Sequence, residues 1–430
     1  EIAQCLVGSE MCIRDSIICA STIICFMVSC NNQNKNGNND DMPSSQDTIS
    51  CDTIPTNINP KSTVPLVNVY MENSGSMQGY NSNNCNDFTS VISELVSVYG
   101  RKNTRGYFYS DGLSEATEAD IFADKIAGKK VIYGKSSPLH VIINSIINKN
   151  SSISFLVTDG IMSGTDEQIN KNSLYNKNYR EELQHSLSDK LKDKQLASSI
   201  YQFESNFDGT YYCYDNSKIN LKGKKRPFYI IAIGKKEYVN DFKKKIADGK
   251  LPDFKPLQQV HFGLIDYPYN VPLSAGIFGK RDSSTITVNV SQIRKRGFEI
   301  DGKRYLDLSI CIPDSMPPHI IEESYILNNL IAKFNGSPIA NELISFNKDS
   351  RTIHIYIHQK DILKNNAFEC SLKYKLPNWC ITCSSSDDKN IAESLLPTTF
   401  NLEYLIKGIQ YGIEGTEGEI WNLKYQIKKK

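Results

Sequence analysis

The fold prediction starts from Val67-Asn-Val-Tyr-Met-Glu-Asn-Ser-Gly-Ser-Met-Gln-Gly-Tyr80. An apolar run that begins at Pro65 ends in Glu72-Asn-Ser-Gly-Ser76, which holds one carboxylate and two hydroxyls. A continuous apolar run bounded by turn residues is typical of a strand buried on both faces of a parallel sheet. In such sheets, ligands bind at the carboxyl ends of the strands. The stretch therefore predicts a buried strand that ends in an oxygen-lined binding site.

Length and charge set broad limits on the rest of the chain. Its 430 residues predict roughly two or three domains of about 150 residues each. The formal net charge is +1, and no basic stripe with interleaved aromatic residues is present in the sequence. We therefore expect no nucleic-acid partner.

Residues 1–30 are expected to be a leader followed by a signal peptide. Glu1–Ser16 resembles a translated sequencing adapter and is left out of the fold prediction. Ile17–Ser29 is an apolar run of 13 residues, shorter than the about 20 that span a bilayer as a helix. Met27-Val-Ser-Cys30 resembles a bacterial lipoprotein box, in which the cysteine is lipidated after cleavage. The resemblance implies an exported lipoprotein, anchored through Cys30 in the cell envelope at the outer membrane or the surface.

A plain secretory signal with an incidental cysteine is the alternative for this leader. Residues 31–63 follow, rich in Asn, Ser, Thr, Asp and Pro. Such a segment has too little apolar surface to offset the entropy of ordering it. We expect a disordered tether that holds the folded part away from the membrane.

Residues 64–250 alternate between strand-like and helix-like segments. Short apolar runs predict strands, among them 153–158 and 227–233, and residues 88–99 and 139–147 have helical spacing of apolar side chains. Leu183, Leu187 and Leu191 predict a helix that continues towards Phe203. This alternation predicts an α/β fold, a doubly wound, mostly parallel sheet of Rossmann-like type with helices on both faces.

Three motifs in this segment resemble those of a von Willebrand factor A domain. Tyr70-Met-Glu-Asn-Ser-Gly-Ser-Met77 is similar to the first, Asp-x-Ser-Gly-Ser-Met after a buried strand. Ser137-Pro-Leu139 is similar to the second, Thr-Pro-Leu, and Leu156-Val-Thr-Asp-Gly160 matches the third, a strand ending in Thr-Asp-Gly. The motifs occur in order at predicted strand ends. The resemblance covers about two-fifths of the chain and says nothing about the rest.

In that family the motifs form a metal-ion-dependent adhesion site. The resemblance implies that Ser74, Ser76 and Ser137 are hydroxyl ligands, and that Glu72 and Asp159 bind directly or through water. An acidic side chain of a protein partner would complete the shell. Oxygen ligands suit Mg²⁺, with Ca²⁺ or Mn²⁺ as alternatives. Glu72 stands where the family has Asp, and the longer side chain suits the adaptable Ca²⁺ better than the geometry-strict Mg²⁺.

Two other functions remain open. In a metal-free structural subunit of an envelope complex, the same side chains would only cap helices and turns. A hydrolase would use Ser74 or Ser76 as its nucleophile, but Gly-x-Ser-x-Gly is absent and no His has an evident partner. We therefore expect a binding protein and no enzymatic activity.

The second half has a different pattern. Residues 251–283 predict a connector without periodicity, and residues 284–430 a β-rich domain. Alternating segments such as 305–312 and 352–357 predict an antiparallel β-sandwich, with a C-terminal helix over 400–409 and a strand over 421–427. His354 and His358 share one face of a predicted strand, where no acidic or cysteine partner is expected nearby.

Overall fold

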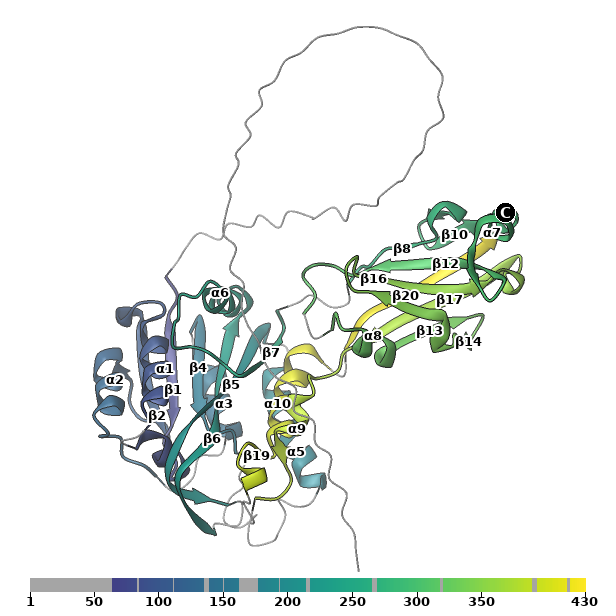
Figure 1. Cartoon of the computed structure of the whole chain (residues 1–430). Helices are drawn as coiled ribbons and strands as arrows, with labels where there is room; N and C mark the ends of the chain where they lie inside the picture. Colours follow the sequence, from purple (N-terminus) through teal and green to yellow (C-terminus); the bar gives the residue numbers. More distant parts are fainter. Residues whose placement is uncertain are drawn as a thin grey trace, which may run out of the picture. The chain divides into compact units, whose positions relative to one another are not determined.

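The first strand, β1 (Val67–Glu72), is buried along its whole length near the middle of a seven-stranded sheet (Figure 1). The structure is a computed structural model. It describes residues 64–82, 85–110, 112–134, 139–149, 151–161, 177–192, 194–213, 217–264, 269–317, 320–388, 393–415 and 418–430. The expected leader and tether, Cys30 and Ser137 lie outside the described residues.

The seven strands follow the order β3-β2-β1-β4-β6-β5-β7. Their bounds are β2 Thr104–Tyr109, β3 Thr117–Glu118, β4 Ile153–Thr158, β5 Leu196–Tyr212, β6 Lys218–Lys235 and β7 Gln258–Phe262. Strand β1 pairs in parallel with both of its neighbours, β2 and β4. The other four described pairs of this sheet are antiparallel. The prediction of a doubly wound, mostly parallel sheet is wrong, because the sheet is mixed.

The long β5–β6 hairpin explains most of this difference. The helix predicted to continue towards Phe203 ends at Leu191, and the chain then enters β5. A short connection forces β6 to run antiparallel to β5. Strand β6 also pairs with β4, so it separates β4 from β5. Strand β7, inside the segment expected to be an irregular connector, adds a further antiparallel edge to β5.

Helices cover the sheet. They are α1 (Asn86–Ser97), α2 (Ala119–Ala127), α3 (Leu139–Asn148), α5 (Lys177–Leu191) and α6 (Lys236–Ala247). Neighbouring residues of β6 point to opposite faces of the sheet. Accordingly, the Phe228 ring lies 5.1 Å from that of Phe88 in α1, while the Tyr229 hydroxyl lies 3.0 Å from the hydroxyl of Thr399. The second face of the sheet is thus covered in part by residues from far along the chain.

The second half contains two further main sheets. One has the order β14-β13-β17-β20-β10-β9, and the other β11-β12-β16-β15 with β8 paired to β12. The bounds are β8 Leu273–Ser274, β9 Gly279–Asp282, β10 Thr285–Val288, β11 Phe298–Ile300, β12 Lys303–Cys311, β13 Leu330–Phe334, β14 Ser337–Pro338, β15 Ile344–Asn347, β16 Thr352–His358, β17 Asn365–Lys373 and β20 Glu419–Lys429. Strands β10 and β20 are parallel, so the prediction of a purely antiparallel arrangement is also wrong.

The helices of the second half are α7 (Val290–Arg296), α8 (Glu323–Asn329), α9 (Trp379–Thr382) and α10 (Leu402–Glu414). Helix α10 confirms the helix predicted near the C-terminus. It packs against α5, because Gly408 and Gly412 bring its backbone close to Leu187 and Leu191. The last predicted strand is confirmed as β20, which pairs with β17.

Candidate functional site

The described site residues lie at the carboxyl ends of two neighbouring parallel strands. Glu72 is the last residue of β1, and Thr158 is the last residue of β4, followed by Asp159. Because β1 and β4 pair in parallel, these ends meet at the same edge of the sheet. Ser76 begins the short helix η1 (Ser76–Asn81), and Ser74 forms an isolated bridge with Gly134. Four of the five predicted ligands are thereby brought to one place.

Hydrogen bonds join these side chains into one cluster. The Thr158 hydroxyl donates to Glu72 Oε2 at 2.5 Å, and the Ser76 hydroxyl donates to Asp159 Oδ2 at 2.5 Å. The Ser74 and Ser76 hydroxyl oxygens are 3.1 Å apart. A side-chain hydrogen bond between Ser74 and Glu72 connects the two groups. We call these five residues, Glu72, Ser74, Ser76, Thr158 and Asp159, the carboxylate–hydroxyl cluster.

Two backbone N–H groups hold the end of β4 in position. Gly160 N donates to Thr158 Oγ1 at 2.9 Å, and Ile161 N donates to Asp159 Oδ1 at 3.1 Å. Gly160 has a φ of +75°, a backbone conformation that L side chains rarely adopt. The glycine of the Thr-Asp-Gly motif thus allows the turn that fixes the Asp159 carboxylate.

Burial dominates the electrostatics of the cluster. Glu72 is 3% exposed and Asp159 is 2% exposed. Burial raises the pKa of Glu72 well above its ordinary value, and the nearby Asp159 carboxylate raises it further. Burial also raises the pKa of Asp159, against the hydrogen bonds from Ser76 and Ile161 N and the charge of Arg226. Both shifts favour a proton on the pair, and the rise in pKa is the larger at Glu72.

The β5–β6 hairpin packs over the turn that carries the two serines. A Cβ atom on Gly75 would lie 2.9 Å from the Tyr212 ring, and one on Gly79 would lie 2.3 Å from the Phe207 ring. Ser74 is 6% exposed and Ser76 is 7% exposed. Glycine at position 79 therefore allows this close approach to the buried Phe207, whereas a larger residue at 75 would displace the Tyr212 ring. In this structure the cluster is covered.

Arg226 is the charged residue near the cluster that the sequence analysis missed. Its side chain is 1% exposed, lies 4.7 Å from the Tyr211 ring and donates to the backbone carbonyls of Leu396 at 2.6 Å and Thr398 at 3.0 Å. In the sequence it ends the basic run that starts at Lys224, which is typical of an exposed turn. No local signal distinguishes it from its exposed neighbours.

The cluster offers only oxygen ligands. Two are carboxylates and three are hydroxyls, which is a hard donor set of the kind that Mg²⁺, Ca²⁺ and Mn²⁺ prefer. Across the described ranges, no group of three or more His, Cys, Asp and Glu side chains lies together. A cation here would thus depend on hydroxyls, water and further ligands. Ser137, the remaining predicted ligand, lies outside the described residues.

The expectation that His354 has no acidic partner is wrong. Its Nδ1 atom lies 2.9 Å from Asp307 Oδ2 on the neighbouring strand β12. This hydrogen bond raises the pKa of His354. The alternation of residues 305–312 put Asp307 on the polar face of its strand, but the pairing register that joins it to His354 could not be read from the sequence.

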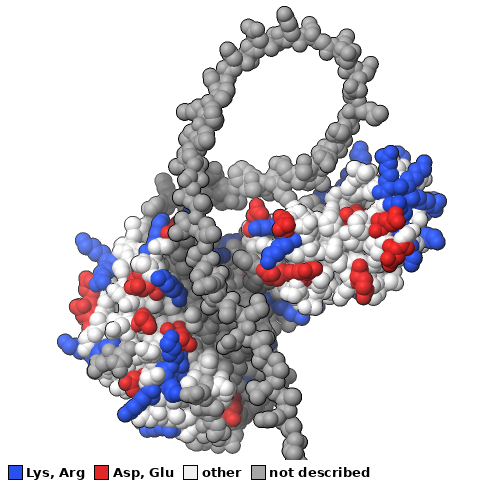
Figure 2. Space-filling model, in the orientation of Figure 1, with Lys and Arg blue, Asp and Glu red and all other residues white. Residues whose placement is uncertain are grey.

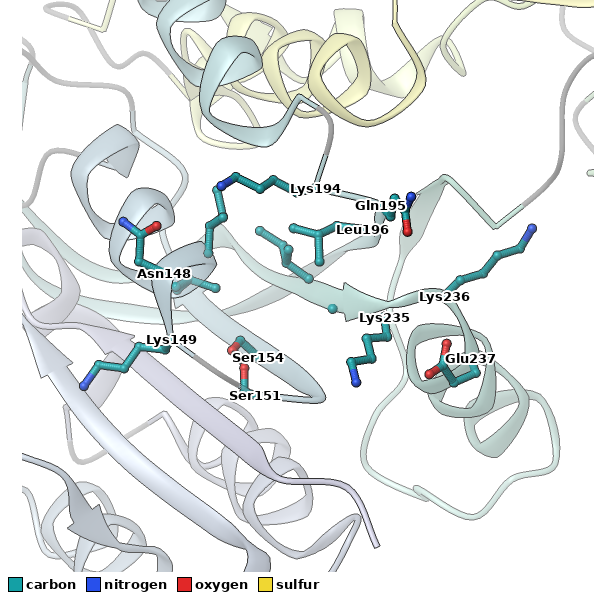
Figure 3. A pocket seen from close by; sticks show the side chains of 14 residues that line it. Asn148, Lys149, Ser151, Ser154, Lys194, Gln195, Leu196, Lys235, Lys236 and Glu237 are labelled. Atoms are coloured by element: carbon teal, nitrogen blue, oxygen red, sulfur yellow. Dashed lines mark hydrogen bonds between the residues drawn. The ribbon is translucent and has the colours of Figure 1, made fainter. Parts of the chain in front are cut away.

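A separate cavity lies at the opposite end of β4 (Figure 3). Its volume is about 560 Å³, and its lining includes Lys149, Lys194, Lys235 and Lys236. Figure 3 shows the side chains of Lys149 and Lys236 directed away from the centre of the cavity. The lining thus carries four lysines beside the acidic Glu237, and it includes none of the cluster residues.

Compared with protein-family models and with curated proteins, the chain finds no match. Within the described ranges, each helix is too short or too polar to cross a bilayer.

Proposed function

We propose that the protein is a bacterial envelope lipoprotein that binds a protein partner through a divalent-cation site at Glu72, Ser74, Ser76 and Asp159. Ser137 as a further hydroxyl ligand and lipidation of Cys30 belong to the same proposal and rest on the sequence. The observation that supports the proposal is a buried pair of carboxylates surrounded by hydroxyls at the ends of two parallel strands. The motifs that resemble those of von Willebrand factor A domains supply the same residues in the same order.

A divalent cation would solve an electrostatic problem at this site. Two carboxylates that lie close together in a buried environment cannot both ionise without a compensating charge. A proton compensates one negative charge, whereas a divalent cation would compensate two and would accept the hydroxyl oxygens as neutral ligands. The longer Glu72 side chain favours the adaptable Ca²⁺ over Mg²⁺ in this proposal.

Binding of a partner would be coupled to a movement of the hairpin. An acidic side chain of the partner must reach a cation at residues that are 2–7% exposed. Tyr212, which packs against Gly75, is among the closest hairpin residues to this turn. Displacement of the Tyr212 ring would expose the turn that carries Ser74 and Ser76.

A metal-free structural subunit is the second candidate, and one observation favours it. Hydroxyls already bind both carboxylates within the cluster, so the side chains can satisfy one another without a cation. In that case the cluster would only fasten the end of β1 to the end of β4. The two candidates differ in what happens when cations are removed.

Calorimetric titration of Mg²⁺, Mn²⁺ and Ca²⁺ into the full chain tests the proposal. We expect a saturable heat that is lost in Ser74→Ala and Asp159→Asn. Ser151→Ala is the matched control, because it removes a hydroxyl near the opposite end of β4 and should keep the heat. If the folded protein gives no heat with any of the three ions, the cation site is excluded and the structural candidate remains.

A further inference from the structure

A second basic cavity, in the second half of the chain, is surrounded by positive charge. Its volume is about 650 Å³, and five of its lining residues are Arg294, Lys360, Lys364, Lys429 and Lys430. We call these five cations the basic end. Figure 2 shows Lys and Arg side chains gathered where Figure 1 places α7 and the C-terminus. Among the described side chains that line the cavity, none is acidic.

The backbone holds the basic end together. Lys429 N donates to the carbonyl of Lys364 at 3.2 Å, and Lys430 N donates to the carbonyl of Val288 at 2.9 Å. Arg294 Nε donates to Gln359 Oε1 at 3.0 Å. Three chain segments that are distant in sequence therefore place their cations around one cavity.

These cations lack ion-pair partners within the part of the chain that the structure describes. No described carboxylate forms an ion pair with any of the five. Asp361, in the turn η6 (Gln359–Asp361), is the acidic residue nearest in sequence to Lys360. The basic end thus carries an uncompensated positive charge, although the whole chain has a formal net charge of only +1.

An exposed apolar side chain lies among these cations. Leu363 is 61% exposed, directly precedes Lys364 and lines the same cavity. Its backbone is held on both sides, because Leu363 N donates to Asn366 Oδ1 at 2.9 Å and Asn366 Nδ2 donates to the Leu363 carbonyl at 3.0 Å. The buried Asn366 also donates to the carbonyl of Ile427 at 2.9 Å, so this loop is fixed to β20. The fold therefore holds a leucine outward in the middle of a basic surface.

We propose that the basic end binds the anionic phospholipid headgroups of a bilayer, with Leu363 inserted among the acyl chains. Lysines near an anionic membrane surface are attracted to it, and an apolar side chain adds affinity through burial in lipid. A nucleic acid fits less well, because no aromatic side chain for a base to stack on is present among the described residues of the lining. The inference does not depend on the proposed cation site. It gives the second half of the chain its own membrane contact.

Co-sedimentation of the full chain with phosphatidylcholine vesicles, with and without phosphatidylglycerol, tests the proposal. The neutral vesicles measure any binding through the apolar leader. We expect additional binding to the anionic vesicles, and we expect high salt to abolish it. In the variant Lys360→Gln/Lys364→Gln/Lys429→Gln this additional partitioning should fall roughly 100-fold, since each lysine near the surface contributes about fivefold.

The control variant is Lys149→Gln/Lys194→Gln/Lys235→Gln, which removes the same charge from the exposed rim of the other basic cavity. It should bind anionic vesicles as the wild type does. Equal losses in the two triple variants would overturn the proposal in favour of diffuse charge attraction. Equal binding to neutral and anionic vesicles would also overturn it.

The variant Leu363→Ser distinguishes binding to a membrane from binding to a soluble polyanion. We expect it to weaken binding to anionic vesicles several-fold and to leave retention on heparin unchanged. If Leu363→Ser has no effect on vesicles while RNA competes fully with them, the partner is a soluble polyanion and the proposal is wrong. All substituted side chains are exposed, so thermal unfolding should show unchanged stability in every variant.

Discussion

At the scale of single residues, Glu72 and Asp159 are buried carboxyl groups that are costly to keep ionised. Both are buried, and Arg226, whose charge lowers the pKa of Asp159, donates instead to backbone carbonyls. Removing a carboxylate from water costs several kcal/mol unless a partner compensates it. Hydroxyl donors and a shared proton, or a cation, provide that compensation. Substitutions at Glu72 distinguish compensation by a proton from compensation by a cation.

Replacing the Glu72 carboxyl, whose pKa burial raises, with a neutral amide tests whether it carries a proton. We expect Glu72→Gln, measured by urea unfolding at neutral pH in a chelator, to be as stable as the wild type or more stable by about 1–3 kcal/mol. The reason is that folding of the wild type must take up a proton at a pH where the unfolded carboxyl is ionised. The same variant should show no heat on cation titration.

Glu72→Ala is the control for this prediction. It removes the carboxyl, leaves a cavity and deprives the Thr158 hydroxyl of its acceptor, so we expect a loss of about 2–4 kcal/mol. A loss of that size in Glu72→Gln as well would contradict the account. It would mean that the native state needs an ionised Glu72.

At the scale of elements, close helix packing ties the second half of the chain to the first. A Cβ atom on Gly412 of α10 would lie 2.5 Å from Leu191 Cβ and 2.8 Å from the Ser188 carbonyl oxygen in α5. A Cβ atom on Gly408 would lie 3.0 Å from Leu187 Cδ2, the end of a flexible side chain. An added methyl group is therefore tolerated less well at Gly412 than at Gly408.

Gly412→Ala should lower the free energy of unfolding by about 1–3 kcal/mol, because overpacking there outweighs the about 1 kcal/mol that alanine gains in helix propensity. Gly408→Ala, the matched control on the same helix face, should lose less or gain slightly. Chemical denaturation of both variants measures the difference. Equal stability of Gly412→Ala and the wild type would show that α10 does not pack on α5 as described.

The C-terminal end of α10 predicts a pH effect. Glu414 accepts a hydrogen bond from Gly263 N at 3.0 Å, and burial raises its pKa from 4.5 to about 7. Between these two values the native state holds a proton that the unfolded state has lost. The stability that Glu414 contributes is therefore fully present below about pH 4.5 and is lost as the pH rises through about 7.

Glu414→Gln should remove this dependence. As the pH rises from about 4.5 to about 7, we expect the wild type to lose about 1–3 kcal/mol more unfolding free energy than the variant loses. Urea unfolding across this range measures it. Parallel stability curves for the two proteins would show that Glu414 titrates as an exposed carboxylate.

At the scale of the whole molecule, contacts between segments that are distant in sequence determine which elements pack together. Arg226 on β6 donates to the carbonyls of Leu396 and Thr398, and the Tyr211 hydroxyl donates to Asp388 at 2.9 Å. These contacts, together with α10 against α5, bring Asp388 and residues 395–414 against the first sheet and its helices. The last strand, β20, then pairs with β17. The chain therefore crosses between its sheet systems more than once, which composition and periodicity do not reveal.

The sequence predicted what depends on local pattern. The apolar runs at β1 and β4 and the alternation at β12 and β16 correspond to observed strands, and the motif spacing brought Glu72, Ser74, Ser76 and Asp159 together. These predictions are correct because neighbouring residues determine which side chains of one element are buried and which way they point.

Pairing between distant segments could not be predicted in the same way. Residues after Leu191 form a strand because β6 and β7 lie on either side of β5, which overrides the helical pattern before it. Thr285 pairs in parallel with Gln426, although nothing near either residue indicates the partner or its direction. The role of Thr158 as the donor to Glu72 depends likewise on the register of β1 and β4.

The most direct test of the cation site is a crystal structure of the full chain with Mn²⁺, with anomalous diffraction measured at the manganese edge. The account predicts one strong anomalous peak within about 2–2.5 Å of oxygen atoms of Glu72, Ser74, Ser76 or Asp159, with the Thr158–Glu72 hydrogen bond rearranged around it. An ordered cluster without a peak, hydrogen-bonded as it is here, would contradict the account. The carboxylates would then be held by a proton and hydroxyls alone.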